Sequence, residues 1–183
     1  TRNTQSKQQL MGFARPTNDP ETLGLWGAIH KRLWEIEGNR AALDEAVDSY
    51  ERSYYLKQDH YNGINLAFLL DVRSDVARQA GLRDDAITDA TLAKRVRAKV
   101  IDYARSKLAD MDAMVSADTP QSQADRYWVN ASIWEAALGL GDDKTKTEIE
   151  RQLADMKMPN WMHESRESQG KKLTELLARR AGP

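Results

Sequence analysis

The stretch DHYNGINLAFLL, residues 59–70, decides how the fold of this chain is read. Asn62-Gly63 is a dipeptide typical of a tight hairpin turn, because both residues tolerate positive φ. The residues after it, however, form an apolar run without the period-two alternation of a half-buried strand. Asp59 is a favourable helix N-cap. The stretch therefore predicts the start of a buried helix, with Gly63 in its first turn.

Gly63 needs a physical reason at this place, because glycine costs about 1 kcal/mol of helix propensity. That cost is tolerable near a helix end. A residue without a Cβ lets the preceding helix, or the ring of Tyr54 or Tyr61, approach the backbone closely. Asn65 follows on the same helix, where its amide can bond to the backbone nearby or point into a groove.

Outward from this stretch, apolar residues recur at spacings of three and four in every segment, and no segment alternates with period two. Start and stop residues divide the chain into helices. Asp19-Pro20-Glu21 begins the first, Gly38 ends it, Asn39 caps the second, and the third runs from Asp59 to Gly81. A long helix begins at Asp84 or Asp85 and stops before Thr119-Pro120. Two more begin near Gln123 and after Gly141-Asp142, Pro159 ends the second of these, and the last covers Ser165 to Arg180.

Short connections join these helices into pairs, so the pairs must fold as antiparallel hairpins. The first helix of each pair carries a small residue among large ones, at Gly27, at Ala67, and at Ala131 or Ser132. Degenerate hairpins of this kind predict an all-α, tetratricopeptide-like superhelix of about three hairpins plus a C-terminal capping helix. The alternative is a generic helical bundle. We expect one helical domain over residues 20–183, preceded by a linker or short helix over residues 1–19.

Composition narrows the function classes. The chain has 27 basic and 28 acidic residues, which gives no net attraction to nucleic acid or to an anionic membrane. It has no cysteine, so disulfides and thiolate chemistry are excluded. No apolar run is long enough to span a bilayer, and the N-terminus lacks a signal core. We expect a cytoplasmic protein and, since no initiator Met is present, a fragment of a larger one.

Four segments, quoted in chain order, resemble a known family: ETLGLWGAIHKRLWE, YERSYYLKQDHYNGINLAFLL, RYWVNASIWEAALGLGDD and MPNWMHESRESQGKKL. They are similar to the TRAF-binding, tetratricopeptide-containing regulatory region of the apoptosis signal-regulating kinases and its bacterial relatives. The matching residues include Tyr61, Gly63 and Asn65 of the Gly-Ile-Asn run, then Trp128 and Trp161. Gln58 departs from the proline that often ends such repeats. No kinase motif is present, so the kinase role does not carry over.

The resemblance implies a non-catalytic protein-interaction and regulatory module, and the alanine-rich, cysteine-free composition suggests a bacterial source. Its partner would be a protein or peptide, or a neighbouring domain of the same protein, held by the inner faces of the first helices. Asn65, Arg126 and Asn130 are the candidate partner-binding residues. Two other classes stay open: an enzyme or small-ligand receptor with a pocket between helices, and a structural spacer or oligomerisation element. The oligomeric state is not readable.

Other residues that could carry a function are better explained by structural roles. The three histidines, His30, His60 and His163, lack metal-ligand spacing, and His30 is expected to pack between Trp26 and Trp34. The five tryptophans stand at helical spacings typical of core packing. The basic run at residues 94–99, KRVRAK, is expected to be a solvated helix face. No nucleophile motif or phosphate loop is present, so we expect no enzyme activity and no cofactor.

Overall fold

The computed structural model describes residues 18–114 and 119–181. The expected linker or short helix at the N-terminus lies almost wholly outside these residues. Within them the chain is all helix, without a strand. The helices are α2 (Pro20–Glu37), α3 (Arg40–Lys57), α4 (His60–Gln79), α5 (Arg83–Ala113), α6 (Pro120–Leu140), α7 (Asp143–Asp155) and α8 (Asn160–Ala181).

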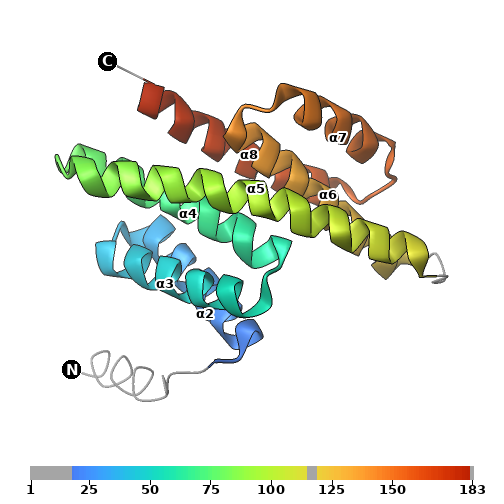
Figure 1. Cartoon of the computed structure of the whole chain (residues 1–183), viewed down its shortest axis with the longest axis horizontal. Coiled ribbons are helices and arrows are strands. Elements are labelled where there is room, and N and C mark those ends of the chain that lie inside the picture. The colour runs from blue at the N-terminus through green and yellow to red at the C-terminus, as the bar shows by residue number, and fades with distance from the viewer. Residues whose placement is uncertain (1–17, 115–118, 182–183) are drawn as a thin grey trace.

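Six of these helices form three consecutive antiparallel hairpins, α2–α3, α4–α5 and α6–α7 (Figure 1). Successive hairpins stack, because α3 packs against α4 and α5 packs against α6. The helices α2, α4 and α6 form a first layer, and α3, α5 and α7 form a second. The helix α8 packs against α4 and α6 of the first layer. The predicted tetratricopeptide-like superhelix of three hairpins and a C-terminal helix is confirmed.

Helix ends near the opening stretch follow the local signals in the sequence. The carboxylate of Asp19 accepts the Thr22 N–H at 2.9 Å, and that of Asp59 accepts the Asn62 N–H at 2.7 Å. Gly38 ends α2 in the left-handed conformation, at φ 63°. Gln58 ends α3 in the same region, at φ 51°. Proline, whose φ is held near −65°, could not adopt this conformation, which explains the departure at Gln58 from the usual repeat ending.

Three predicted helix boundaries are wrong. Thr119-Pro120 begins α6 rather than only ending the helix before it, so α6 starts ahead of Gln123. The Thr119 hydroxyl accepts the Ser122 N–H at 3.1 Å, while the Ser122 hydroxyl accepts the Thr119 N–H at 3.0 Å. This is a reciprocal capping box followed by proline at the first helical position, where its missing N–H costs nothing.

The other two boundaries move in the same direction. The helix α8 begins at Asn160, five residues before Ser165, so Pro159 stands just ahead of a helix instead of only ending one. The helix α5 begins at Arg83, which places Asp84 and Asp85 inside its first turn. Acidic side chains are favourable there because they face the positive end of the helix dipole.

Gly63 lies buried where three helices meet. A Cβ at this position would stand 2.6 Å from Cγ2 of Val100 on α5 and 3.0 Å from the ring of Tyr54 on α3. The same relationship recurs in the first hairpin, where a Cβ on Gly27 would stand 2.7 Å from the Tyr50 ring. The predicted reason for Gly63 is confirmed for Tyr54, and the sequence reading missed Val100. The glycine therefore sets how closely α5 approaches α4.

Candidate functional site

A cleft opens between the first-layer helices and α8. Its volume is about 510 Å³, and we call it the inner cleft. The second layer packs on one side of α4 and α6, and α8 lies on the other, so the cleft belongs to the concave side of the superhelix. Four helices supply its lining: Lys31 from α2; His60, Tyr61, Ile64 and Asn65 from α4; Trp128, Ala131, Ser132 and Glu135 from α6; and Ser165, Arg166, Ser168, Gln169 and Lys172 from α8.

Asn65 is the one predicted partner-binding residue that lines the inner cleft. Its Nδ2 donates to the carbonyl of Tyr61 at 3.0 Å, one turn back on α4. Its Oδ1 accepts from Nζ of Lys31 at 3.1 Å, across the gap to α2. Both expected roles of the amide are therefore present. One half of the amide is held by the backbone, and the other orients a cationic side chain at the cleft.

Lys31 and Glu135 place opposite charges in the same cleft. Burial lowers the pKa of Lys31, while the carboxylates of Glu135 and Glu35 act against this shift. The Lys31 ammonium also lies 4.9 Å from the centroid of the Phe68 ring. Burial raises the pKa of Glu135, whose Oε1 accepts from Nε2 of Gln169 at 3.1 Å. The cleft thus holds a half-buried ammonium group and a half-buried carboxyl group, whose interactions are stronger there than at the open surface.

Arg126 and Asn130 do not join Asn65 at the inner cleft. The side chain of Asn130 is buried, and its Nδ2 donates to the Arg126 carbonyl at 3.1 Å. The guanidinium of Arg126 pairs with Asp112 of α5 at 2.7 Å. The cleft-facing residues of α6 stand at positions 128, 131, 132 and 135, a spacing of three and four that leaves positions 126 and 130 on another face.

Exposed aromatic side chains stand at and beside the inner cleft: Tyr61 belongs to its lining, and Trp161 lies against Trp128 of the lining. Tyr61 is 53% exposed and Trp161 is 60% exposed, which is high for side chains of this size. The rings of Trp128 and Trp161 lie 6.0 Å apart, a tilted contact. The expectation that the tryptophans pack in the core holds for Trp134, and it is wrong for Trp161. The early start of α8, which the sequence reading missed, places Trp161 in a first helical turn beside α6.

His60 and Ser132 form the pair in the cleft that most resembles catalytic machinery. Nδ1 of His60 lies 3.0 Å from Oγ of Ser132, a distance at which a base could activate a nucleophile. The Ser132 hydroxyl, however, donates to the carbonyl of Trp128 at 3.0 Å, so its proton points into its own helix. Burial lowers the pKa of His60, with Asp59 acting in the opposite direction. The geometry is that of a hydroxyl bridging two helices, not an activated serine.

The structure also places His30 and the basic run at residues 94–99. His30 lies against the ring of Trp26, with centroids 4.6 Å apart. The basic run at residues 94–99 is mostly exposed, yet Arg97 within it is fully buried, so the expectation of a wholly solvated face is wrong.

Across residues 18–114 and 119–181, no three His, Asp or Glu side chains gather as a metal site would require. No helix in those ranges is both long and apolar enough to cross a membrane.

Residues 1–70 match the model of the family described as Tetratricopeptide Repeats-Sensor. The match ends with the stretch DHYNGINLAFLL and so covers α2, α3 and the first half of α4. The match over this part of the chain agrees with the stacked hairpins, which form a tetratricopeptide-like helical superhelix. No curated protein and no solved structure matches the chain.

Proposed function

We propose that this chain is a non-catalytic protein-interaction and regulatory module that holds its partner at the inner cleft. The observation that carries the proposal is the composition of the cleft. Polar side chains from α2, α4, α6 and α8 stand around aromatic and apolar side chains from α4 and α6. Tyr61 in the lining is exposed, and so is Trp161, which lies against Trp128 of the lining. Exposed aromatic residues beside a concave surface are characteristic of protein-binding sites, and solenoids use that surface for recognition.

Asn65 and Lys31 supply the polar part of the proposed contact. Because Lys31 is oriented by the Asn65 amide, its remaining N–H groups are available to a carbonyl or carboxylate of the partner. Arg126 and Asn130 would reach a partner only along the α5 side of α6, where Arg126 already pairs with Asp112. The proposed partner is a protein or peptide segment, or a neighbouring domain of the same, larger protein.

The more specific role that we propose rests on the resemblance of the sequence to a known family. The Gly-Ile-Asn run and the later tryptophan segments resemble the TRAF-binding regulatory region of the apoptosis signal-regulating kinases and its bacterial relatives. The family matched over residues 1–70 carries the word sensor in its description, which agrees with a regulatory rather than a catalytic role. On this basis we assign the module to the cytoplasm of a bacterium, as part of a larger regulatory protein.

A cross-linking experiment tests the site. A photoreactive phenylalanine analogue replaces Tyr61 in the native gene product, and a matched control carries it at Tyr55, which is equally exposed but stands on α3 in the second layer. Light should join a defined partner to position 61 and not to position 55. Asn65→Ala should weaken the captured complex about three- to tenfold, the usual cost of one lost hydrogen bond. Equal adducts at both positions would refute the assignment.

A small-ligand receptor is the second candidate, because the volume of about 510 Å³ falls in the range of small-molecule sites. The two candidates differ in what stabilises the protein. A receptor should show a raised melting temperature with one class of metabolite in a broad thermal-shift screen, and Ser132→Leu should abolish that shift by filling the cleft. A protein-interaction module should show no such shift and should bind a polypeptide instead.

A further inference from the structure

The C-terminal helix α8 lies where a bound ligand of a solenoid groove would lie. Its main contacts are with α4 and α6 of the first layer, and Lys172 extends to Glu35 of α2 at 2.9 Å. A helix that continued the stack would instead pack against α7, as α4 packs against α3 and α6 against α5. The position of α8 is therefore that of an occupant of the concave face, not of a fourth repeat.

One side of α8 carries all the residues that dock. Met162, Leu173 and Leu176 are buried, and Gly170 lies beneath the Trp134 ring, so closely that any Cβ there would collide with the indole. The opposite side is open, with Lys171 80% exposed. This pattern is the helix-in-groove mode of peptide recognition, in which an amphipathic helix lays its apolar face into a groove.

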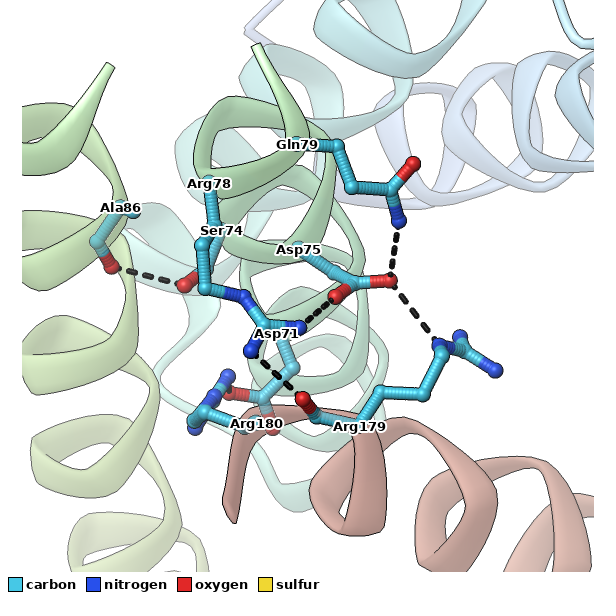
Figure 2. A network of polar contacts seen from close by, with 8 residues as sticks. All are labelled: Asp71, Ser74, Asp75, Arg78, Gln79, Ala86, Arg179 and Arg180. Atoms are coloured by element: carbon cyan, nitrogen blue, oxygen red, sulfur yellow. Dashed lines mark hydrogen bonds and ion pairs between the residues drawn. The ribbon is translucent and has the colours of Figure 1, made fainter. Parts of the chain in front are cut away.

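The last turn of α8 is held by charge, as Figure 2 shows. Nε of Arg179 lies 3.1 Å from Oδ2 of Asp75, and the neighbouring Arg180 pairs with Asp71. Both carboxylates belong to α4, one helical turn apart. In return, Nη1 of Arg78 on α4 donates to the backbone carbonyl of Arg179 at 2.5 Å. Two consecutive arginines and the carboxyl end of a helix are thus recognised together.

Neither carboxylate depends on α8 for its only partner. Asp75 also accepts from Nη2 of Arg78 at 2.5 Å and from Nε2 of Gln79 at 3.0 Å, both within α4. Asp71 also pairs with Arg97 of α5 at 2.6 Å. An unpaired buried charge is strongly unfavourable, so these inner partners hold both carboxylates in place whether or not α8 is docked. The acidic pair is a preformed receptor for arginine.

We propose that the concave surface under α8 is a binding surface for an amphipathic helix that ends in two arginines. The helix α8 occupies it in the free chain, and a partner helix of the same chemistry takes its place. This inference rests on the proposed function, because it names the kind of partner that the concave face accepts. Release of α8 would expose Met162, Leu173 and Leu176 to water, so we expect exchange with another helix rather than spontaneous opening.

Clefts beside α8 give an incoming helix access to the surface that α8 covers. The inner cleft lies along the first half of α8, and a second cleft of about 620 Å³ continues along its second half, between α2, α4 and α8. Trp34, Val72 and Leu176 line this second cleft, and Asp75 stands at it with Arg179. Exposed aromatic side chains at the inner cleft offer a first contact at the other end. One flank of the resident helix is therefore accessible along most of its length before it leaves.

The test uses the full chain and, as probe, a synthetic peptide of residues 160–181 labelled with a fluorophore. Binding is measured by anisotropy to three chains: the parent, the double variant Arg179→Gln/Arg180→Gln, and the control Lys171→Gln, which changes one charge on the open side of α8. The double variant should bind the peptide about tenfold more tightly than the parent, because its own helix competes less well. The control should match the parent.

A second variant tests the surface without altering charge. Gly170→Leu forces the resident α8 away from Trp134 and should also raise the affinity for the peptide. A peptide carrying glutamine at both arginine positions should bind every chain about tenfold more weakly than the native peptide. Raising salt should narrow the difference between the two peptides only slightly, because Asp71 and Asp75 are buried and buried ion pairs are screened much less than exposed ones.

Exchange is observed directly by labelling, since the chain has no cysteine of its own. Spin labels are placed at Ala178→Cys on α8 and Lys94→Cys on α5, both exposed positions. Pulsed dipolar spectroscopy should show one distance in the free chain and a second, longer one when the peptide is added to the double variant. Equal affinity of both peptides for all chains, or an unchanged distance with bound peptide, would overturn the inference. A partner could still cross-link to position 61 in that case. The exchange of α8 can therefore be refuted without refuting the proposed function.

Discussion

Arg97 of α5 and Asp71 of α4 form an ion pair in which Nη2 and Oδ2 lie 2.6 Å apart, and both side chains are 0% exposed. Gly139 of α6 lies directly against the guanidinium, leaving no room for a side chain there. The guanidinium nitrogens have no hydrogen-bond partner of good geometry among the described residues. The pair therefore joins the two helices of the second hairpin through charge, and Gly139 lets α6 of the third hairpin pack against its guanidinium.

Asp71→Ala should lower the free energy of unfolding by about 3–5 kcal/mol, because it leaves the Arg97 charge buried and unpaired. Urea denaturation monitored by circular dichroism measures the change. The control is Asp44→Ala, which breaks the exposed Arg40–Asp44 pair and should cost less than about 1 kcal/mol. The double change Asp71→Leu/Arg97→Met should recover most of the loss. Equal free energies of unfolding for Asp71→Ala and Asp44→Ala would show that the buried pair contributes no more to stability than the exposed one.

Gly63→Leu should destabilise the protein by about 1–3 kcal/mol net, although leucine is the better helix former by nearly 1 kcal/mol. The reason is the Cβ contact with Val100, a stiff β-branched side chain that cannot turn aside. Gly63→Ala should show a smaller loss in the same direction. In a Val100→Ala background the alanine change should become nearly neutral. A stable Gly63→Leu protein would show that α4 and α5 are not in close contact at this point.

Thr119→Ala should cost about 1 kcal/mol, the usual value of an N-cap residue. The threonine hydroxyl holds the Ser122 N–H at the start of α6, and alanine offers no acceptor. The matched change is Asp19→Ala, at the N-cap of α2, which is likewise followed by a proline. It should cost a similar amount of stability. Melting temperatures give the comparison. No effect at Thr119 would mean that α6 begins later, near Gln123.

Acidification should weaken the fold through His60. Burial holds the pKa of His60 below its ordinary value of 6.5, so the unfolded chain binds more protons than the folded one as the pH falls past 6.5. The free energy of unfolding should therefore fall as the pH drops through about 6.5, and this contribution should stop changing once His60 is protonated in the folded protein as well. His60→Gln, which can still bond to Ser132, should reduce this dependence without removing other titrations. A steeper dependence in the variant would show that His60 is not the group responsible.

Local signals explain why much of the fold was readable in advance. The caps at Asp19, Asn39 and Asp59 act within one turn of their own helix, so residue type and spacing predict them without knowledge of the rest of the chain. The short connections between helices then require antiparallel hairpins. The misplaced starts of α6 and α8 share a single cause: a proline that can end one helix and stand at the beginning of the next was read only as an end.

The candidate site was predicted less completely, because side-chain direction depends on how each helix is rotated. Asn65 was found at the inner cleft, where it stands one turn after Tyr61 on the same face of α4. Asn130 has the same residue type and lies in the equivalent helix of the third hairpin, yet it is turned into the protein. Lys31, Glu135 and Arg166 gave no signal in the sequence, because single charged residues on an amphipathic helix are normally solvated.

For residues 18–114 and 119–181, the sequence by itself determined the seven helices, their pairing into hairpins and the tetratricopeptide-like fold, because periodicity, caps and short loops are properties of neighbouring residues. Only the tertiary structure decided that Arg97 is buried against Asp71, that Trp161 is exposed, and that α8 lies across α4 and α6 with Arg179 at Asp75. The ion pair between Arg179 and Asp75 joins residues 104 positions apart. These facts follow from the angle at which hairpins stack, which is the summed result of many side-chain contacts and is not encoded in any one segment.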